Sequence, residues 1–184
     1  MNKKNLIIDK TFTLACQNHK KNNFKVAEKL YKEILKTNPS HFQTAYLLGT
    51  LSLQIKNLEQ AKQLFDKALK IDPNHAPAYN NLGLVFKELN EYQKAISCYK
   101  KAIQIDPDYV IALNNLGKTL EELNHINEAA KHYEKSLNLN PNKKETYADY
   151  GKTLLKLNRH SKALAYIRKG TGLIIFTQKD FEII

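Results

Sequence analysis

The stretch that decides the fold is Ala78–Pro107, which reads AYNNLGLVFKELNEYQKAISCYKKAIQIDP. Among its small residues are Gly83 in the first half and Ala95 in the second. Asn90 lies between them and tolerates the left-handed backbone that ends a helix. Pro107 closes the stretch, because proline cannot continue a helix. The stretch therefore predicts two helices joined by a short turn.

The same features recur along the chain with a period of 34 residues. One series consists of glycines and the other of prolines: Gly49, Gly83, Gly117 and Gly151, then Pro39, Pro73, Pro107 and Pro141. Two independent series with one period indicate a repeat fold, and this period is typical of a helix-turn-helix unit. Numbering each unit so that the proline is at position 32 places unit starts at residues 8, 42, 76, 110 and 144.

Small and large residues alternate between fixed positions of these units. Position 20 is always alanine, and position 8 is alanine in the first unit and glycine in the others. Small residues let the two helices approach closely, while larger residues fill the space beside the contact. We expect these fillers at position 7 (Leu14, Leu48, Leu82, Leu116, Tyr150) and position 24 (Tyr31, Phe65, Tyr99, Tyr133, Ile167).

Helix ends can also be placed from the sequence. We predict that Ser40, Asn74, Asp108 and Asn142, at position 33, cap the first helix of the next unit. We predict that the first helix ends in left-handed residues at position 15, namely Asn22, Asn90, Asn124 and Asn158. In the second unit we assign this role to Asn57, one residue later.

The quoted stretch resembles the tetratricopeptide repeats of the O-linked N-acetylglucosamine transferase type. The resemblance extends over residues 8–170 and implies an all-α, right-handed superhelical solenoid of about five antiparallel helix-turn-helix repeats. We expect repeats at 8–41, 42–75, 76–109, 110–143 and 144–170. A short extension, 1–7, precedes them, and an apolar non-repeat tail, 171–184, follows.

The resemblance also implies where a ligand would bind. In such solenoids the first helix of each repeat lines a concave groove, with positions 2, 5, 6, 9, 12 and 13 facing it. We expect a peptide-binding groove that includes Tyr46, Leu47, Asn80, Asn81, Asn114, Asn115, Lys118 and Lys152. Asn81 and Asn115 match the asparagine ladder of the transferase type, and amides can bond a peptide backbone. An acidic or amphipathic peptide would suit this surface.

A purely structural reading of the same residues stays open. Asparagine tolerates a crowded helix face, and the chain is rich in asparagine. The groove lysines could pair with Glu88, Glu121 and Glu122 on neighbouring helices instead of meeting a ligand. The lysine and arginine set that clamps a terminal carboxylate in chaperone-binding members is absent, since Phe12 and Pro77 occupy two of its positions.

The net charge of +11 favours acidic partners, nucleic acid or anionic membranes at long range. We expect no membrane partner, because no stretch approaches about 20 apolar residues. Nucleic-acid binding through the basic surface stays a less favoured alternative, because the aromatic residues fall on packing positions instead of among the lysines. Cys16 and Cys98 are two repeats apart, too far for a disulfide, and no secretory stretch begins the chain. These features predict a cytoplasmic protein.

No motif for chemistry is present in the sequence. The histidines show no metal-ligand spacing, and the glycines form no phosphate loop. We therefore expect no enzymatic activity, no catalytic residue, no metal and no cofactor. The main hypothesis is a protein-protein interaction scaffold, whose exposed end faces would also allow self-association.

The tail supplies an alternative. It is apolar, Leu173–Thr177 reads as a strand, and a solenoid normally ends in a polar capping helix. Either the tail covers the last repeat, or another domain begins near Gly172. In the second case the repeats would be the substrate-recruiting arm of a longer enzyme of glycosyltransferase or oxygenase type.

Overall fold

The structure is a computed structural model that describes residues 3–172, 175–176 and 181–182. The chain divides into two compact units, residues 1–89 and 90–184, and the division falls between the two helices of the third repeat. Each unit is described by itself.

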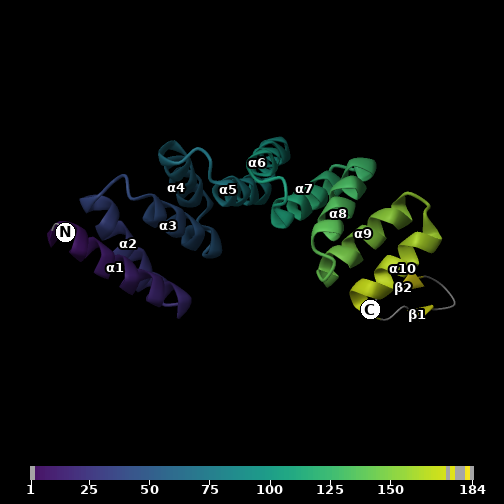
Figure 1. The fold of residues 1–184 in the computed structure, drawn as a ribbon, viewed down its shortest axis with the longest axis horizontal. Coiled ribbons are helices and arrows are strands. Elements are labelled where there is room, and N and C mark those ends of the chain that lie inside the picture. Colours follow the sequence, from purple (N-terminus) through teal and green to yellow (C-terminus); the bar gives the residue numbers. More distant parts are fainter. Residues whose placement is uncertain (1–2, 173–174, 177–180, 183–184) are drawn as a thin grey trace. The chain divides into compact units, whose positions relative to one another are not determined.

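The first unit holds five α-helices in its described part (Figure 1). They are α1 (Lys3–Lys20), α2 (Phe24–Thr37), α3 (Phe42–Gln54), α4 (Leu58–Ile71) and α5 (Ala76–Glu88). Each helix packs against the next in sequence, and α3 also contacts α5. The first helix begins at Lys3, so residues 3–7 are helical.

The second unit also holds five α-helices in its described part. They are α6 (Tyr92–Ile105), α7 (Val110–Glu122), α8 (Ile126–Leu139), α9 (Lys144–Lys156) and α10 (His160–Thr171). Sequential neighbours pack against each other, and α7 contacts α9. After α10 the short strands β1 (Ile175–Phe176) and β2 (Phe181–Glu182) pair antiparallel. Residues 173, 174 and 177 of the predicted strand lie outside the described residues, as does most of the tail.

In the first, second, fourth and fifth repeats, whose two helices belong to one unit, the core forms where the helices approach at small residues, as predicted. The large side chains at position 24 are buried, and Tyr31, Phe65, Tyr99 and Tyr133 are 0% exposed. A Cβ atom on Gly117 would lie 2.8 Å from the Tyr133 ring, and one on Gly49 would lie 2.9 Å from the Phe65 ring. The aromatic ring therefore occupies the space that a side chain at position 8 would need.

One predicted filler is wrong. Leu14 is 48% exposed, whereas Leu48, at the same position of the next repeat, is 1% exposed and packs with Ala27 and Tyr31 of the repeat before it. Position 7 thus packs against the preceding repeat. In the described part of the chain no helix precedes α1, so Leu14 has nothing to cover it.

The predicted turns are right in four repeats and wrong in one. Asn22, Asn90, Asn124 and Asn158 all have positive φ, from 57° to 61°. In the second repeat Lys56 has this conformation, with φ 61°. Asn57 instead caps α4, and its side chain accepts a hydrogen bond from the amide of Gln60.

The predicted caps at position 33 are also wrong. Helices α3 and α5 are capped one residue later, by the Nδ1 atoms of His41 and His75, which accept from the amides of Thr44 and Ala78. The amides at position 33 are donors to the side chains two residues before them, such as Asn38 and Asp72. The polar residue at position 31 therefore closes this turn.

Gly170 provides a test of the close approach between α9 and α10. A Cβ atom there would lie 2.6 Å from the backbone N of Ala148 and 2.8 Å from the backbone O of Lys144. Gly170→Ala would ordinarily stabilise a helix interior. Here we expect it to lower the free energy of unfolding by about 1–3 kcal/mol, because backbone atoms cannot yield as side chains do. Urea unfolding beside Ser161→Ala, an exposed change in the same helix, measures the effect; a gain in stability would contradict this packing.

Candidate functional site

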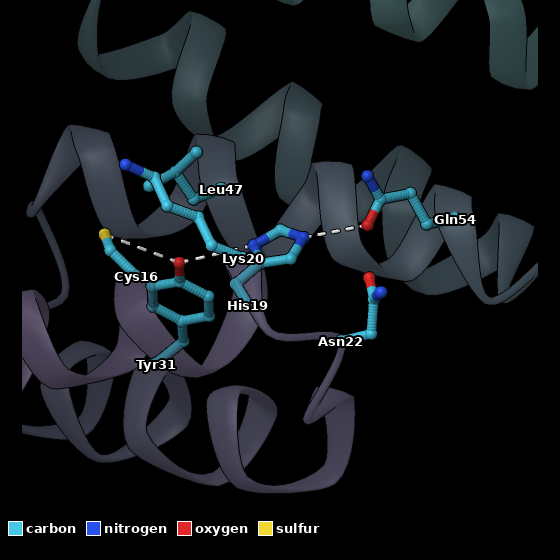
Figure 2. A pocket seen from close by; sticks show the side chains of 7 residues that line it. All are labelled: Cys16, His19, Lys20, Asn22, Tyr31, Leu47 and Gln54. Atoms are coloured by element: carbon cyan, nitrogen blue, oxygen red, sulfur yellow. Dashed lines mark hydrogen bonds between the residues drawn. The ribbon is translucent and has the colours of Figure 1, made fainter.

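A cavity of about 370 Å³ opens in the first unit where α1, α2 and α3 meet (Figure 2). Its lining consists of Cys16, His19, Lys20, Asn22, Tyr31, Leu47 and Gln54. Five of these residues occupy the inner positions of a repeat, defined as positions 2, 5, 6, 9, 12 and 13. They are at positions 9, 12 and 13 of repeat 1 and at positions 6 and 13 of repeat 2. Five of the lining residues therefore belong to the set of positions that the resemblance assigns to a ligand groove.

Hydrogen bonds cross this cavity from one helix to the next. The Tyr31 hydroxyl lies 3.6 Å from Cys16 Sγ and 3.4 Å from His19 Nδ1. His19 Nε2 lies 2.8 Å from Gln54 Oε1. Figure 2 marks these hydrogen bonds with dashed lines. Because the Gln54 oxygen can only accept, His19 Nε2 donates to it. The burial of Tyr31 raises the pKa of its phenol, and its contact with Cys16 adds to this.

A second cavity, of about 390 Å³, lies in the second unit between α7 and α9. It is lined by Lys118, Glu121, Glu122, Asp149, Lys152 and Lys156. Lys118 Nζ lies 3.2 Å from Asp149 Oδ2, and Lys156 Nζ lies 3.1 Å from Glu121 Oε1. These ion pairs join two helices of successive repeats. Two of the three lysines that line this cavity are therefore paired with carboxylates of the same cavity.

The two cavities occupy equivalent places in the repeat. The tyrosine at position 24 reaches position 12 of its own repeat, which is His19 in one case and Glu121 in the other. Position 12 in turn reaches position 13 of the next repeat, which is Gln54 or Lys156. One arrangement of three side chains is thus built twice with different chemistry.

The structure brings some of the predicted groove residues together. In the first unit Asn81 Nδ2 donates to the Tyr46 hydroxyl at 3.3 Å, and Asn80 Nδ2 donates to Asn81 Oδ1 at 3.2 Å. Asn80 is 2% exposed, so a ligand could reach it only if neighbouring side chains moved. Leu47 lines the first cavity. Burial raises the pKa of the Tyr46 phenol, which stays a neutral hydrogen-bonding group.

The other predicted groove residues lie in the second unit. Lys118 and Lys152 line the same cavity. Asn114 is 5% exposed, and neither its amide nitrogen nor its amide oxygen has a partner among the described residues. Asn115 accepts a hydrogen bond from the Thr119 hydroxyl at its backbone oxygen. The two asparagine pairs therefore differ in their contacts, although they share positions in the repeat.

Sequence reasoning missed His19, Lys20, Asn22, Tyr31 and Gln54 as residues of one site. The repeat pattern places Tyr31 only in the core, yet its hydroxyl reaches the cavity while its ring is buried. The sequence separation of the contacting residues could have identified them. The contacting residues are 12 and 35 positions apart in both cavities, which is the spacing that the 34-residue period imposes on neighbouring helix faces.

The described residues meet the requirements of neither a metal site nor a membrane-spanning helix. Within the described residues, no group of three or more His, Cys, Asp or Glu side chains could hold a metal ion. Across the same residues, no helix is both long enough and apolar enough to cross a membrane.

The sequence matches models of one protein family. Four family models described as tetratricopeptide repeat match residues 19–83, 76–109, 110–143 and 132–165. No curated protein matches the sequence significantly.

Solved structures with the same fold are numerous. A crystal structure of MamA is 26% identical, with a TM-score of 0.79, and the match covers 85% of this chain and 91% of that chain. PilF of Pseudomonas aeruginosa is 22% identical, with a TM-score of 0.84 and coverage of 93% and 78%. YrrB, described as a TPR protein with an unusual peptide-binding site, is 18% identical, with a TM-score of 0.73 and coverage of 93% and 92%.

The hydroxyl of Tyr133 provides a test of the second cavity. It donates to Glu121 Oε2 at 2.9 Å, and Tyr133→Phe removes this donor while keeping the ring. At pH 8 we expect the free energy of unfolding to fall by about 0.5–1.5 kcal/mol.

The pH dependence of this difference carries a definite sign. Burial, and next the Glu121 charge, raise the pKa of Tyr133 above its ordinary value of 10.0. Above pH 10 the unfolded chain loses this proton first, so the native protein loses stability by up to about 1.4 kcal/mol per pH unit from this group. The Phe variant lacks this loss, and urea unfolding at pH 8, 10 and 11 should show the difference shrinking. A constant difference would contradict the assigned environment.

Proposed function

Because the chain belongs to the tetratricopeptide repeat family, we propose that it is a non-catalytic interaction scaffold that holds a peptide or protein segment on the inner positions of its repeats. Within a unit the segment would lie along the first helices of the repeats, which are α1, α3 and α5 in the first unit and α7 and α9 in the second.

The observation that carries this proposal is the pair of equivalent cavities. The buried packing residues beside the two cavities are identical at equivalent positions: Tyr31 corresponds to Tyr133, and Ala27 corresponds to Ala129. Five of the seven residues that line the first cavity change: Cys16, His19, Lys20, Leu47 and Gln54 correspond to Lys118, Glu121, Glu122, Asp149 and Lys156 in the second, while Asn22 and Tyr31 correspond to an identical Asn124 and Tyr133. Because the fold keeps its small and large packing residues at positions 8, 20 and 24 while these five positions vary, their variation supports a role in contacting something else.

The chemistry of the two surfaces suits a peptide. The first cavity offers side-chain amides, a lysine and the half-buried Leu47, and the second offers lysines and carboxylates. Such groups can bond a peptide backbone or its polar side chains. YrrB gives a parallel on the same fold, because its peptide-binding site is described for that protein. The identity of the bound segment would be set by the inner side chains, because the repeats share their packing residues.

Site-specific photo-crosslinking in source cells tests the proposal. A photo-reactive amino acid is placed at Gln54 or Lys152 on the inner positions, with matched controls at the exposed outer-helix residues Lys29 and Lys135. We expect discrete crosslinked proteins from the two inner positions and few or none from the controls, because the partner would cover only the inner side. Equal crosslinking from inner and outer positions would contradict the proposal.

A further inference from the structure

We propose that the cavity of the first unit, at Lys20, His19, Gln54 and Leu47, is an anchor site for an internal aspartate or glutamate side chain of the partner peptide. This inference rests on the proposed scaffold function and names the chemistry that one part of its surface selects.

The first argument is charge. Lys20 is the only residue with a full charge at neutral pH in the cavity lining, where no carboxylate is present. Within the described residues Lys20 forms no ion pair, and its side chain is exposed. In the equivalent cavity Lys118 and Lys156 are each matched by a carboxylate on the neighbouring first helix. The first cavity thus has a cation without its counterpart, which a ligand could supply.

The second argument is the direction of the hydrogen bonds. The Gln54 oxygen is occupied by His19 Nε2 at 2.8 Å, so its amide N–H groups remain as donors to a ligand. Asn22 adds a second amide at the rim of the cavity. A carboxylate is an acceptor only and takes up to four hydrogen bonds, so it fits the donors that Lys20, the Gln54 amide and the Asn22 amide nitrogen present here.

The end of α1 does not cancel this preference. A helix C-terminus ordinarily repels an anion through its unpaired carbonyl groups. Here the backbone oxygens of Gln17, Asn18 and His19 already accept from the amides of Lys21, Asn23 and Asn22. The left-handed turn at Asn22 makes this closure possible, with φ 60°. Lys20 therefore keeps its charge available to a ligand.

The third argument is the apolar wall. Leu47 is half-buried and lies beside the polar groups, and Cys16 adds a further apolar surface. A residue next to the acidic one would pack there. The anchor therefore fits an acidic residue flanked by an aliphatic residue.

A phage-displayed library of random twelve-residue peptides, selected on the full chain, tests this site. Selections run in parallel on the wild type, Lys20→Met, Lys20→Glu and the control Lys29→Glu, which changes an exposed lysine on α2. We expect wild type and Lys29→Glu to enrich peptides with Asp or Glu beside an aliphatic residue. Lys20→Glu should enrich Lys or Arg at that place, a gain of specificity that simple damage to the fold would not produce.

The best wild-type peptide is then made with a fluorescent label and measured by anisotropy. We expect Lys20→Met to weaken its binding about 3- to 10-fold, as for loss of a partly exposed charged hydrogen bond. Replacing the peptide's Glu by Gln should weaken binding to the wild type by a similar factor and have little further effect on Lys20→Met.

The possible outcomes separate this inference from the scaffold proposal. Enriched peptides that bind all four proteins equally and lack an acidic residue would overturn the anchor but leave the scaffold standing. No enriched peptide on any protein would count against both. A version of the peptide with phosphoserine in place of Glu that binds more than about 10-fold tighter would overturn the carboxylate assignment in favour of phosphate.

Discussion

The close approach of the two helices in the first, second, fourth and fifth repeats is the contact on which the rest of each unit depends. Glycine or alanine at position 8 leaves room for the large side chain at position 24, and the ring at Tyr133 or Phe65 lies where a larger residue would need to be. Tight packing of this kind tolerates little change in volume. It fixes the pairing of each first helix with its second helix, and the inner positions follow from it.

The same contact links the core to the candidate site. The Tyr31 and Tyr133 rings are buried, but their hydroxyl groups extend to position 12 on the inner side. From there the bonds continue to the next repeat, through Gln54 or Lys156. One residue thus serves packing with its ring and hydrogen bonding with its oxygen, so the cavity geometry is held by the core while its chemistry varies.

Much of the fold could be predicted from the sequence because it rests on residue size at a fixed period. The four turn asparagines and the buried position-24 side chains follow from local properties of single residues. The histidine caps at His41 and His75 do not, since a ring nitrogen one residue later competes with the expected caps. The cavity around His19 depends on side chains from three helices meeting, and sequence periodicity alone does not show which of them reach one another. The repeat pattern misplaces Leu14 because the role of position 7 depends on a preceding repeat.

The central claim is that packing positions hold the fold while inner positions are free to take a partner's chemistry. It is tested most directly by urea unfolding of a chain in which the first cavity carries the residues of the second: Cys16→Lys, His19→Glu, Lys20→Glu, Leu47→Asp and Gln54→Lys. The carboxylate introduced at residue 19 and the ammonium introduced at residue 54 would then form around Tyr31 the bonds that Glu121 and Lys156 make around Tyr133. The account predicts a free energy of unfolding within about 1–2 kcal/mol of the parent, since positions 7, 8, 20 and 24 stay unchanged and the new charges on the half-buried positions of Cys16 and Leu47 pair as Lys118 and Asp149 do. Loss of cooperative unfolding would contradict it and would show that the inner residues specify the fold.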